Sequence, residues 1–372
     1  MNILHLYKDY YPVIGGIENH IKVLAEAQVA AGHRVAVLAC SPECWTGKET
    51  LNGVLVIKAG RLTTAASMPI SVSQPLILAR LRPDVLHIHS PYPLGEISNW
   101  LLGRAGATVL THHSDVVRQK KWLYLYGPFL RRVLRSADRI IATSPPYIES
   151  SPWLRPVRER CAVVPLGVDT TCFRPSPRPR TGSGSGRAEL LFVGRLRYYK
   201  GLDTLLAALV SIPQARLTVV GDGPMRRPWE KLSQELGLGE RAVFAGEVGD
   251  DDLPACYQSA DMFVLPANAR AEAFGTVLLE AMASGLPCVS TELGTGTSWI
   301  VQDGVTGRVV PPSNPEALAA AIRMLAADPV CSLAMGMAGR RRIEEGFSVQ
   351  TMIAGVEALY RETLMRKEAG RA

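Results

Sequence analysis

The sequence lacks the features that mark several specialised classes of protein. It has no run of roughly 18 or more apolar residues, so a membrane-spanning helix is not expected. The 7 cysteines are odd in number, scattered, and without a Cys-x-x-Cys pair, which argues against a disulfide framework and a zinc site. Charged residues make up only 20% of the chain and apolar residues 47%, a globular composition that excludes a disordered or fibrous protein.

Positive charge exceeds negative charge. The 372 residues include 41 Lys and Arg against 34 Asp and Glu, a formal net charge of +7. Such an excess suits phosphate-bearing ligands, anionic membrane surfaces and nucleic acid, without choosing among them. Lys8 and Asp9 interrupt the first apolar stretch too early for the core of a signal peptide. We therefore expect a cytoplasmic protein.

Short apolar segments alternate with segments of helical periodicity along most of the chain. Strands alternating with helices predict an α/β fold in which parallel sheets are covered on both faces. The segments that read as strands are 2–7, 34–39, 85–89, 107–111, 138–142 and 161–164 in the first half, and 189–193, 216–220, 242–244, 261–265 and 287–290 in the second.

Composition divides the chain into four parts. Residues 174–187 are rich in Pro, Gly and Ser and lack apolar periodicity, as in a linker. Residues 1–173 and 188–345 each repeat the strand–helix rhythm, which predicts two Rossmann-like domains. The end of the chain is helical, and its last segment, 346–372, is expected to pack back on the first domain. Because ligands bind beyond the carboxyl ends of parallel strands, we expect the two domains to face each other across a cleft.

Two cations follow the first strand of the second half. Arg195 and Lys200 lie between that strand and a helix that begins near Leu202. Arg forks onto phosphate oxygens, Lys adds a point charge, and a helix end adds backbone donors. The pattern therefore indicates an anion site. The alternative is that both cations are exposed and merely solvated.

Two carboxylates flank another candidate phosphate site in the second half. Gly275 allows a phosphate to approach the N–H groups at the start of the helix that follows it. Glu272 precedes this helix and Glu280 lies in its second turn, among apolar neighbours. Carboxylates accept hydrogen bonds from sugar hydroxyls. For Glu280 the alternative is a salt bridge with a nearby Arg, because an unpaired buried carboxylate is costly.

Glycines and histidines are the candidate binding residues of the first half. Gly15 and Gly16 follow the first strand and permit a ligand to approach the backbone, although a plain tight turn explains them equally. His112 and His113 follow a later strand. They are candidates for hydrogen bonding to a substrate. No metal is expected, because no Cys or third His lies at ligand spacing. His87 and His89 point to one face of a strand, and for His87 a structural role is favoured.

A basic and aromatic stretch covers residues 118–135, with six cations and no anion. Such a stretch suits an anionic membrane surface, and equally an anionic glycan or a lipid diphosphate acceptor. The alternative is an ordinary amphipathic helix whose apolar stripe faces the core, broken at Gly127-Pro128. No RNA-binding module is recognised, so nucleic acid is not expected as a partner. The residues singled out for this surface are Lys120, Lys121, Trp122, Arg131 and Arg132.

Five motifs in this order resemble the retaining glycosyltransferases of family 4, which have the GT-B fold. They are GGIE at 15–18, THHSD at 111–115, GRLRYYKG at 194–201, GDGP at 221–224 and EAFGTVLLE at 272–280. The two-glutamate spacing of the last motif, together with the GR and KG pairs, is the most specific feature. The resemblance covers nearly the whole chain and implies that the second domain holds a nucleotide-sugar donor.

The resemblance also implies roles for individual residues. Arg195 and Lys200 would hold the donor diphosphate, and Gly16 would let the backbone of the first domain approach it. Glu280 would bind the ribose hydroxyls and Glu272 the hydroxyls of the donor sugar. His113 best matches the loop histidine that contacts the donor sugar, although the adjacent His112 leaves this assignment open. The backbone amides that would approach sugar and phosphate are those of Phe274, Gly275 and Thr276.

The function implied is transfer of a hexose, with retention of configuration and without a metal or other cofactor. We expect mannose from GDP-mannose, passed to a glycan or a lipid-linked oligosaccharide of bacterial polysaccharide assembly. Peripheral association with the cytoplasmic face of the inner membrane is a further expectation. The alternatives are a UDP-hexose-dependent transferase, a GT-B sugar-nucleotide epimerase, and a nucleotide-sugar-binding protein without activity.

Overall fold

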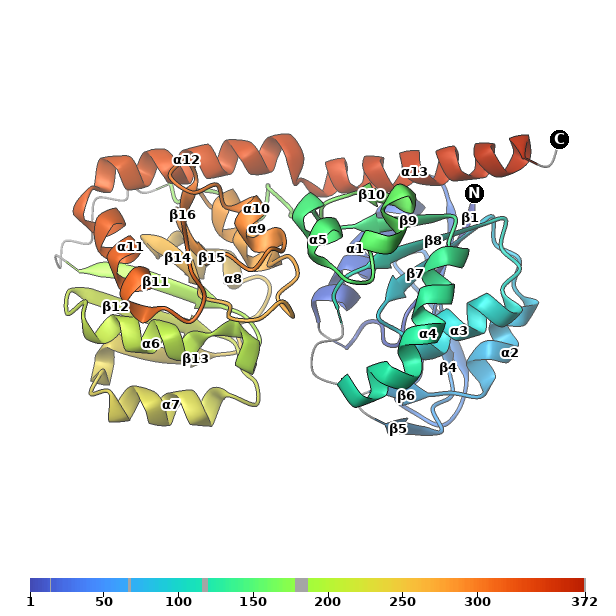
Figure 1. Cartoon of the computed structure of the whole chain (residues 1–372), viewed down its shortest axis with the longest axis horizontal. Helices are drawn as coiled ribbons and strands as arrows, with labels where there is room; N and C mark the ends of the chain where they lie inside the picture. Colours follow the sequence, from blue (N-terminus) through green and yellow to red (C-terminus); the bar gives the residue numbers. More distant parts are fainter. Residues whose placement is uncertain (14, 66–67, 116–119, 178–186, 371–372) are drawn as a thin grey trace. The chain divides into compact units, whose positions relative to one another are not determined.

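The computed structural model describes residues 1–13, 15–65, 68–115, 120–177 and 187–370, with the side chains of 120–123 outside the description. The chain forms two compact units (Figure 1). The first contains Met1–Pro165 and Gln350–Ala372, and the second contains Leu166–Val349. Each unit is built on its own sheet of wholly or mainly parallel strands, which confirms the predicted α/β class.

The first unit has an eight-stranded sheet in the order β10-β9-β8-β7-β1-β2-β4-β3. All neighbouring strands are parallel except β3 and β4. The strands are β1 (Asn2–Leu6), β2 (Arg34–Cys40), β3 (Gly47–Leu51), β4 (Val54–Ala59), β7 (Val85–Ser90), β8 (Ala107–His112), β9 (Arg139–Ala142) and β10 (Cys161–Val163), with a separate ribbon of β5 (Thr63–Ala65) and β6 (Met68–Ile70). The helices are α1 (Gly16–Ala30), α2 (Ser73–Arg80), α3 (Pro93–Leu102), α4 (Lys120–Ser136), α5 (Pro145–Ser150), the 3-10 helix η1 (Arg155–Arg160) and α13 (Val349–Ala369).

The second unit has a six-stranded parallel sheet in the order β13-β12-β11-β14-β15-β16. Its strands are β11 (Ala188–Val193), β12 (Ala215–Val220), β13 (Ala242–Gly246), β14 (Met262–Leu265), β15 (Cys288–Thr291) and β16 (Gly307–Val310). Its helices are η2 (Tyr198–Lys200), α6 (Leu202–Val210), α7 (Arg226–Glu235), η3 (Gly239–Arg241), α8 (Leu253–Gln258), α9 (Thr276–Ala283), α10 (Gly296–Ile300), α11 (Pro315–Ala327) and α12 (Pro329–Gly346).

The strand order fixes where ligands can bind in each unit. In the second unit the chain moves outward from β11 in one direction, then returns to add β14 on the other side of β11. In the first unit the corresponding reversal lies between β1 and β7. Open parallel sheets bind ligands at such switch points, beyond the carboxyl ends of the strands. The segments that follow β1, β7, β11 and β14 are therefore the ones that the topology places at the two candidate sites.

The boundaries between the units differ from the predicted 173 and 345. Leu166 and Val168 are buried in the core of the second unit, so the crossover comes earlier. Arg340 of α12 binds the backbone carbonyls of Thr170 and Phe173 and fixes this segment on the same unit.

The start of the predicted linker also lies on the second unit. The carbonyl of Arg174 accepts a hydrogen bond from Gln258, whereas 178–186 lie outside the described residues. At the other boundary, Phe347 is buried in the second core, so the return comes at Gln350 rather than at 346.

Helix α13 packs within the first unit, as expected for the end of the chain. Tyr360 is fully buried, and its hydroxyl lies 2.6 Å from His87 Nδ1. Lys367 Nζ lies 2.8 Å from Asp138 Oδ2. These contacts tie the last helix to β7 and to the residue before β9.

Two further differences concern local structure. Helix α4 continues through Pro128, where a break was expected. Gly127 is buried beside Trp153, and a Cβ there would lie 3.0 Å from the indole, so packing on this face supports the turn that Pro128 weakens. The short strands β3 to β6 and β16 were not predicted.

No single described helix is long and apolar enough to cross a membrane. Helices α11 and α12 reach the required length and composition only when taken together, and they are bent by 103° where they meet.

Candidate functional site

A buried ion pair lies beyond the carboxyl end of β11. Lys200 ends the 3-10 turn η2 and Glu272 lies in the loop between β14 and α9, so the pair joins the two strands at the switch point. Lys200 Nζ lies 2.7 Å from Glu272 Oε2, and both side chains are about one-tenth exposed. The sequence placed each residue in a separate candidate site, whereas the structure joins them in one.

The charge of Glu272 keeps Lys200 ionised. Burial alone would lower the pKa of Lys200, but Glu272, with smaller contributions from Tyr199 and Glu280, raises it above its ordinary value. A cation held in a buried position by one carboxylate is a preformed partner for an anionic ligand.

Glycine backbones hold the Lys200 turn against its neighbours. Gly201 has φ +68°, and a Cβ there would lie 2.0 Å from the carbonyl oxygen of Pro266, after β14. Gly221 of the GDGP turn also approaches a carbonyl oxygen closely, because a Cβ there would lie 2.3 Å from the oxygen of Gly194. Leu196 N donates to the carbonyl of Asp222 at 2.9 Å. The GDGP motif therefore shapes the turn that carries Arg195 and Lys200.

Glu280 has a hydroxyl as its partner rather than the arginine that the sequence suggested. The buried Tyr257 of α8 donates its OH to Glu280 Oε2 at 2.6 Å. Burial raises the pKa of Glu280, while the Tyr257 hydrogen bond and the charge of Lys200 oppose the rise. Glu280 lies in α9, the helix that begins directly after Gly275. The carboxylate is therefore partly desolvated and held in place.

The start of α9 is fixed by the loop before α10. Gly275 has φ +85°, and Phe274 beside it is buried. Gly296 N donates to the carbonyl of Ala273 at 2.8 Å, and Thr295 Oγ1 donates to the carbonyl of Glu272 at 3.0 Å. This supporting loop could not be predicted from the sequence, because its threonines act on the backbone and carry no motif of their own.

Arg195 completes the set in the second unit. Its side chain is exposed, and no ion pair to it is present among the described residues. The site thus combines an exposed arginine, a buried Lys–Glu pair, a partly buried glutamate and the N-terminus of α9. Such a set can bind a phosphate-bearing ligand that also carries hydroxyl groups.

Gly16 is the first residue of α1, after β1, and a Cβ added there would meet nothing within 4 Å. The backbone at this helix start is therefore open, as a ligand contact requires. Gly15 before it is confined by the carboxylate of Glu18.

Histidines from distant segments gather on one face of the first sheet. Sequence spacing did not predict this cluster, because its members lie in β1, α1, β7 and the segment after β8. In two groups of three, the ring nitrogens lie within 4.8 Å of one another. The members are His5, His20, His87, His89 and His113.

His112 lies apart from this cluster. Its Nε2 lies 3.1 Å from Asp115 Oδ1 and its Nδ1 lies 3.3 Å from Ser90 Oγ. Both ring nitrogens of His112 are thus engaged locally, whereas His113 joins the cluster through Nε2.

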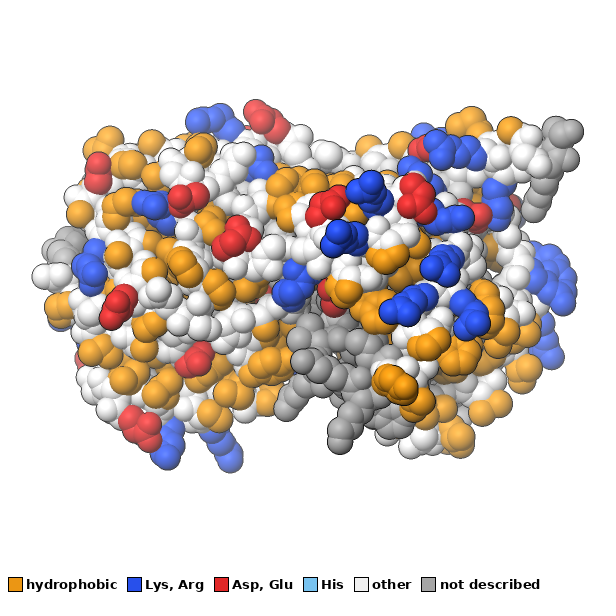
Figure 2. Space-filling view, viewed as in Figure 1, with side chains coloured by type: hydrophobic (Ala, Val, Ile, Leu, Met, Phe, Trp, Pro, Cys, Tyr) orange, Lys and Arg blue, Asp and Glu red, His pale blue; other side chains and the backbone are white. Residues whose placement is uncertain are grey.

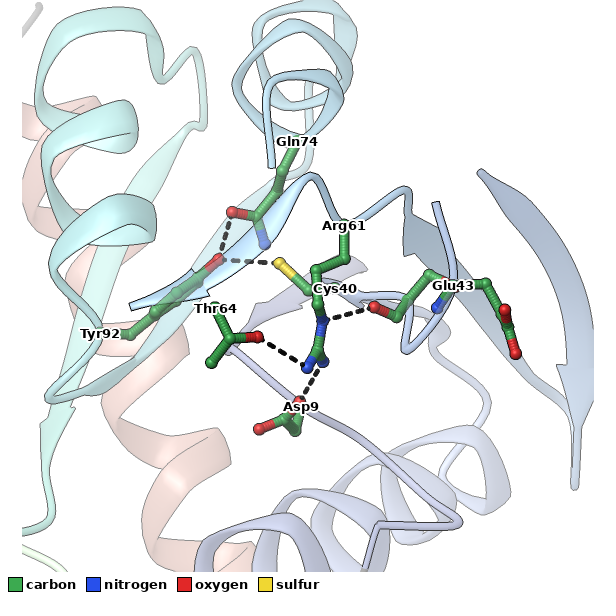
Figure 3. Close-up of polar contacts among 8 residues, drawn as sticks. Asp9, Cys40, Glu43, Arg61, Thr64, Gln74 and Tyr92 are labelled. Atoms are coloured by element: carbon green, nitrogen blue, oxygen red, sulfur yellow. Dashed lines mark hydrogen bonds and ion pairs between the residues drawn. The ribbon is translucent and has the colours of Figure 1, made fainter. Parts of the chain in front are cut away.

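A polar network at the carboxyl edge of the first sheet was also missed (Figure 3). The Arg61 guanidinium donates to Asp9 at 3.0 Å and to the carbonyl of Ser41 at 2.8 Å. Tyr92 donates to Gln74 at 2.5 Å and lies 3.3 Å from Cys40 Sγ. Asp9, Ser41, Arg61 and Tyr92 follow β1, β2, β4 and β7, so their positions after strands were the available signal.

The predicted basic surface is described in part. Arg131 and Arg132 are exposed on α4, and the Arg131 guanidinium lies over Trp153 at 5.6 Å. The side chains of Lys120, Lys121 and Trp122 lie outside the described residues.

A cavity of about 580 Å³ in the second unit lies away from all of these residues. It is lined by Ala188, Asp261, Met262 and Pro287, at the beginnings of strands. Ligands of open parallel sheets bind at the opposite ends of the strands. We therefore assign the site by its chemistry and not by this cavity.

The raised pKa of Glu280 predicts how stability changes when its charge is removed. A carboxyl whose pKa is higher in the folded state adds stability at pH values below its unfolded pKa. That contribution is lost as the pH rises through the folded pKa. Glu280→Gln keeps an acceptor for Tyr257 and carries no charge. We expect its free energy of unfolding to exceed that of the wild type at pH 7.5, and the gain to shrink towards pH 4.5.

Chemical denaturation at several pH values measures this difference. Glu235→Gln is the matched control, because the Glu235 side chain is 56% exposed and should show no such pH-dependent gain. A Glu280→Gln variant that is less stable than the wild type at pH 7.5 would contradict the account.

Family models match both halves of the chain. Residues 14–171 match the model described as Glycosyltransferase Family 4. Residues 174–342 match the model described as Glycosyl transferases group 1.

Relatives extend over the whole length. The O-antigen chain mannosyltransferase C of Escherichia coli is 35% identical over 99% of this chain and 100% of its own. The D-rhamnosyltransferase WbpZ of Pseudomonas aeruginosa is 37% identical over 94% of this chain and 92% of its own.

A solved structure agrees in fold. Sucrose-phosphate synthase from Thermosynechococcus elongatus superposes with a TM-score of 0.80 and 25% identity, over 98% of this chain and 99% of that chain. The motifs, the two Rossmann-like units and the full-length relatives lead to one conclusion: the chain is a glycosyltransferase of family 4 with the GT-B fold.

Proposed function

We propose that this enzyme is a retaining, metal-independent mannosyltransferase. It takes mannose from GDP-mannose and passes it to a glycan or lipid-linked oligosaccharide acceptor. The observation that carries the proposal is the buried Lys200–Glu272 pair at the switch point of the second sheet, with Glu280 on the adjoining helix. Relatives named as O-antigen mannosyltransferase and rhamnosyltransferase support a deoxyhexose or hexose and a polysaccharide product.

The donor contacts follow from the chemistry of each group. Lys200 and Arg195 bind the diphosphate, and the amides of 274–276 approach it at the start of α9. Glu280, held by Tyr257, accepts hydrogen bonds from the ribose hydroxyls. Glu272 leaves its contact with Lys200 in part and accepts from hydroxyls of the sugar. Lys200 then pairs with the diphosphate, which replaces Glu272 as its anionic partner.

The reaction places charge where these groups can stabilise it. The sugar–phosphate bond breaks as the anomeric carbon gains oxocarbenium character, and negative charge grows on the leaving diphosphate. Lys200, Arg195 and the helix N–H groups stabilise that charge. The acceptor hydroxyl attacks from the face that the diphosphate leaves, and the diphosphate takes its proton, so configuration is retained. Gly16 and His113 are the residues of the first unit assigned to the donor.

A transfer assay tests the function. The purified enzyme is given GDP-mannose, UDP-glucose or UDP-galactose with a polyprenyl-diphosphate oligosaccharide acceptor, with and without EDTA. We expect transfer from GDP-mannose, an α-linked product by NMR, and no loss in EDTA. The chelator matters because Asp250, Asp251 and Asp252 form an exposed acidic triplet, contrary to the expectation that the sequence has no Asp-x-Asp motif.

Lys200→Met serves as the matching variant in this assay. Loss of a charge that stabilises the leaving group is expected to lower kcat by about 10²–10³-fold. Lys231→Met is the control, since the Lys231 side chain is 78% exposed.

The alternatives give different results in the same assay. Transfer from a UDP-sugar alone identifies a UDP-hexose-dependent enzyme. Conversion of the donor without an acceptor identifies an epimerase, and donor binding without turnover identifies a binding protein. An inverted product or a strict metal requirement would contradict the proposed mechanism.

We further propose that α4 rests on an anionic membrane surface at the cytoplasmic face. Exposed apolar side chains, Tyr124 at 86% and Leu125 at 64%, lie on the same helix as the exposed Arg131 and Arg132. Figure 2 shows basic side chains beside hydrophobic ones over this part of the first unit. Basic residues next to exposed apolar ones suit the interface of a membrane that contains anionic lipids.

Vesicle sedimentation tests this surface. Each basic residue near an anionic membrane contributes about 1 kcal/mol, so Arg131→Gln with Arg132→Gln should weaken binding to phosphatidylglycerol vesicles about tenfold or more. Arg361→Gln with Arg366→Gln removes the same charge from α13, where both side chains are at least 60% exposed. Equal losses in both double variants would show a general charge effect and contradict a specific surface on α4.

A further inference from the structure

The buried histidines form a continuous chain of hydrogen bonds across the first unit. His5 Nε2 lies 2.8 Å from Gln28 Oε1 of α1. His5 Nδ1 lies 3.1 Å from His89 Nε2, and His89 Nδ1 lies 3.0 Å from His113 Nε2. The chain runs from the C-terminal part of α1, through the middle of the sheet, to the segment that follows β8.

The Gln28 end of this hydrogen-bond chain determines which ring nitrogen of each histidine carries the proton. An amide oxygen only accepts hydrogen bonds, so His5 carries its proton on Nε2 and donates to Gln28. His5 Nδ1 then accepts, which requires the proton of His89 on Nε2. His89 Nδ1 accepts in turn, which requires the proton of His113 on Nε2. The Nδ1 atom of His113 is left as an acceptor.

The three histidines of this hydrogen-bond chain are neutral and shielded from water. His5 and His89 are fully buried and His113 is 6% exposed. Burial lowers the pKa of His5 to about 4 and that of His113 well below its ordinary value, in the latter case with a contribution from His20. A neutral imidazole has one donor and one acceptor, so the order of donors and acceptors is preserved along the chain. Burying polar rings in a sheet core is costly unless each is satisfied.

We propose that Gln28, His5 and His89 are positioning residues that hold the proton of His113 on Nε2, so that His113 Nδ1 accepts a hydrogen bond from a hydroxyl group of the donor sugar. The inference rests on the proposed contact between His113 and the donor. It adds the selection of one tautomer by a residue at the other end of the hydrogen-bond chain.

A metal site is the alternative function for this cluster. Zinc binds imidazole nitrogens at about 2.0–2.1 Å, which places tetrahedral ligands roughly 3.3 Å apart. The spacings of 3.0 and 3.1 Å between His rings are hydrogen-bond lengths. His20 Nε2 is buried and has no hydrogen-bond partner among the described residues, but a metal there would displace the proton shared by His89 and His113. The hydrogen-bond chain gives a partner to more of the ring nitrogen atoms of the cluster than a metal at this position would.

The tautomers can be read directly in protein labelled with ¹⁵N-histidine. Two-bond ¹H–¹⁵N spectra distinguish a ring protonated on Nε2 from one protonated on Nδ1. His113 is assigned by the loss of its signals in His113→Gln. In the wild type we expect Nε2–H for His5, His89 and His113. A proton on Nδ1 of any of them overturns the inference, even if no variant folds.

Removing the acceptor at the Gln28 end of the hydrogen-bond chain tests whether Gln28 controls the tautomer of His113. Gln28→Met removes the acceptor with little change in side-chain length, so the proton of His5 should move to Nδ1 and the order reverse along the chain. We expect His113 to become Nδ1–H and kcat/KM for the donor to fall about fivefold, the value of one hydrogen bond. Gln74→Met is the matched control and should leave the tautomer of His113 unchanged. Gln74 is also a fully buried glutamine of the first unit, and it takes no part in the hydrogen bonds between the histidines.

The outcomes separate this inference from the proposed function. An unchanged His113 tautomer in Gln28→Met overturns the inference, while donor transfer by the wild type still supports the function. A wild type that shows the expected tautomers but neither binds nor transfers a sugar nucleotide removes the function and the sugar contact together. Near-stoichiometric zinc by mass spectrometry, with loss of the His89 and His113 ring protons, identifies a metal site and overturns the inference.

Discussion

The buried contact between Lys200 and Glu272 is the interaction on which the proposed donor site depends. Each charge is shielded from water and requires the other, and removing one partner of such a pair typically costs about 3–5 kcal/mol. Yet the pair is not closed to ligands, because the exposed Arg195 and the start of α9 adjoin it in sequence and topology. In the proposed donor complex, the diphosphate takes the place of Glu272 beside Lys200 and frees the carboxylate for hydroxyl groups. On this proposal, the ion pair keeps an anion site ready in the absence of ligand.

Parallel topology explains why residues far apart in the chain meet at this point. Lys200 follows β11 and Glu272 follows β14. These two strands are neighbours because the chain first adds β12 and β13 on one side of β11 and then adds β14 on the other. The same principle operates in the first unit, where β1 and β7 are adjacent. There it aligns His5 with His87 and places a column of imidazoles under α1 and α13. Each unit therefore has a buried polar cluster where these two neighbouring strands lie side by side.

Much of this could be predicted from the sequence, because the signals were local. Buried strands such as β11 read as short apolar runs, and Arg195, Lys200 and Glu272 lie in the segments between a strand and the next helix. What could not be predicted depended on contacts between distant segments. Tyr257 as the partner of Glu280 is one case, since nothing near Glu280 in the sequence points to α8. The histidine chain is another, because His5 is a single polar residue in an apolar strand and Gln28 is an ordinary helix residue.

The predicted domain boundaries were wrong for a related reason. The Pro- and Gly-rich composition after 173 gave a clear linker signal, whereas Leu166 and Val168 look like any loop residues until their burial in the second core is seen. The mostly buried, six-residue β4 reads as an apolar run and could have been predicted. Strands β3 and β5 could not, because they are short and exposed. Periodicity detects segments with one buried face, and it has little to detect in such strands.

The proposed contact on which the mechanism depends most is the one between Lys200 and the diphosphate of the donor, which GDP has and GMP lacks. Calorimetric titration of GDP and of GMP into the wild type and Lys200→Met measures this most directly. The account predicts that the wild type binds GDP much more tightly than GMP, and that Lys200→Met loses most of this difference while its affinity for GMP changes little. Equal affinities of the wild type for GDP and GMP, or an undiminished preference for GDP in Lys200→Met, would contradict it.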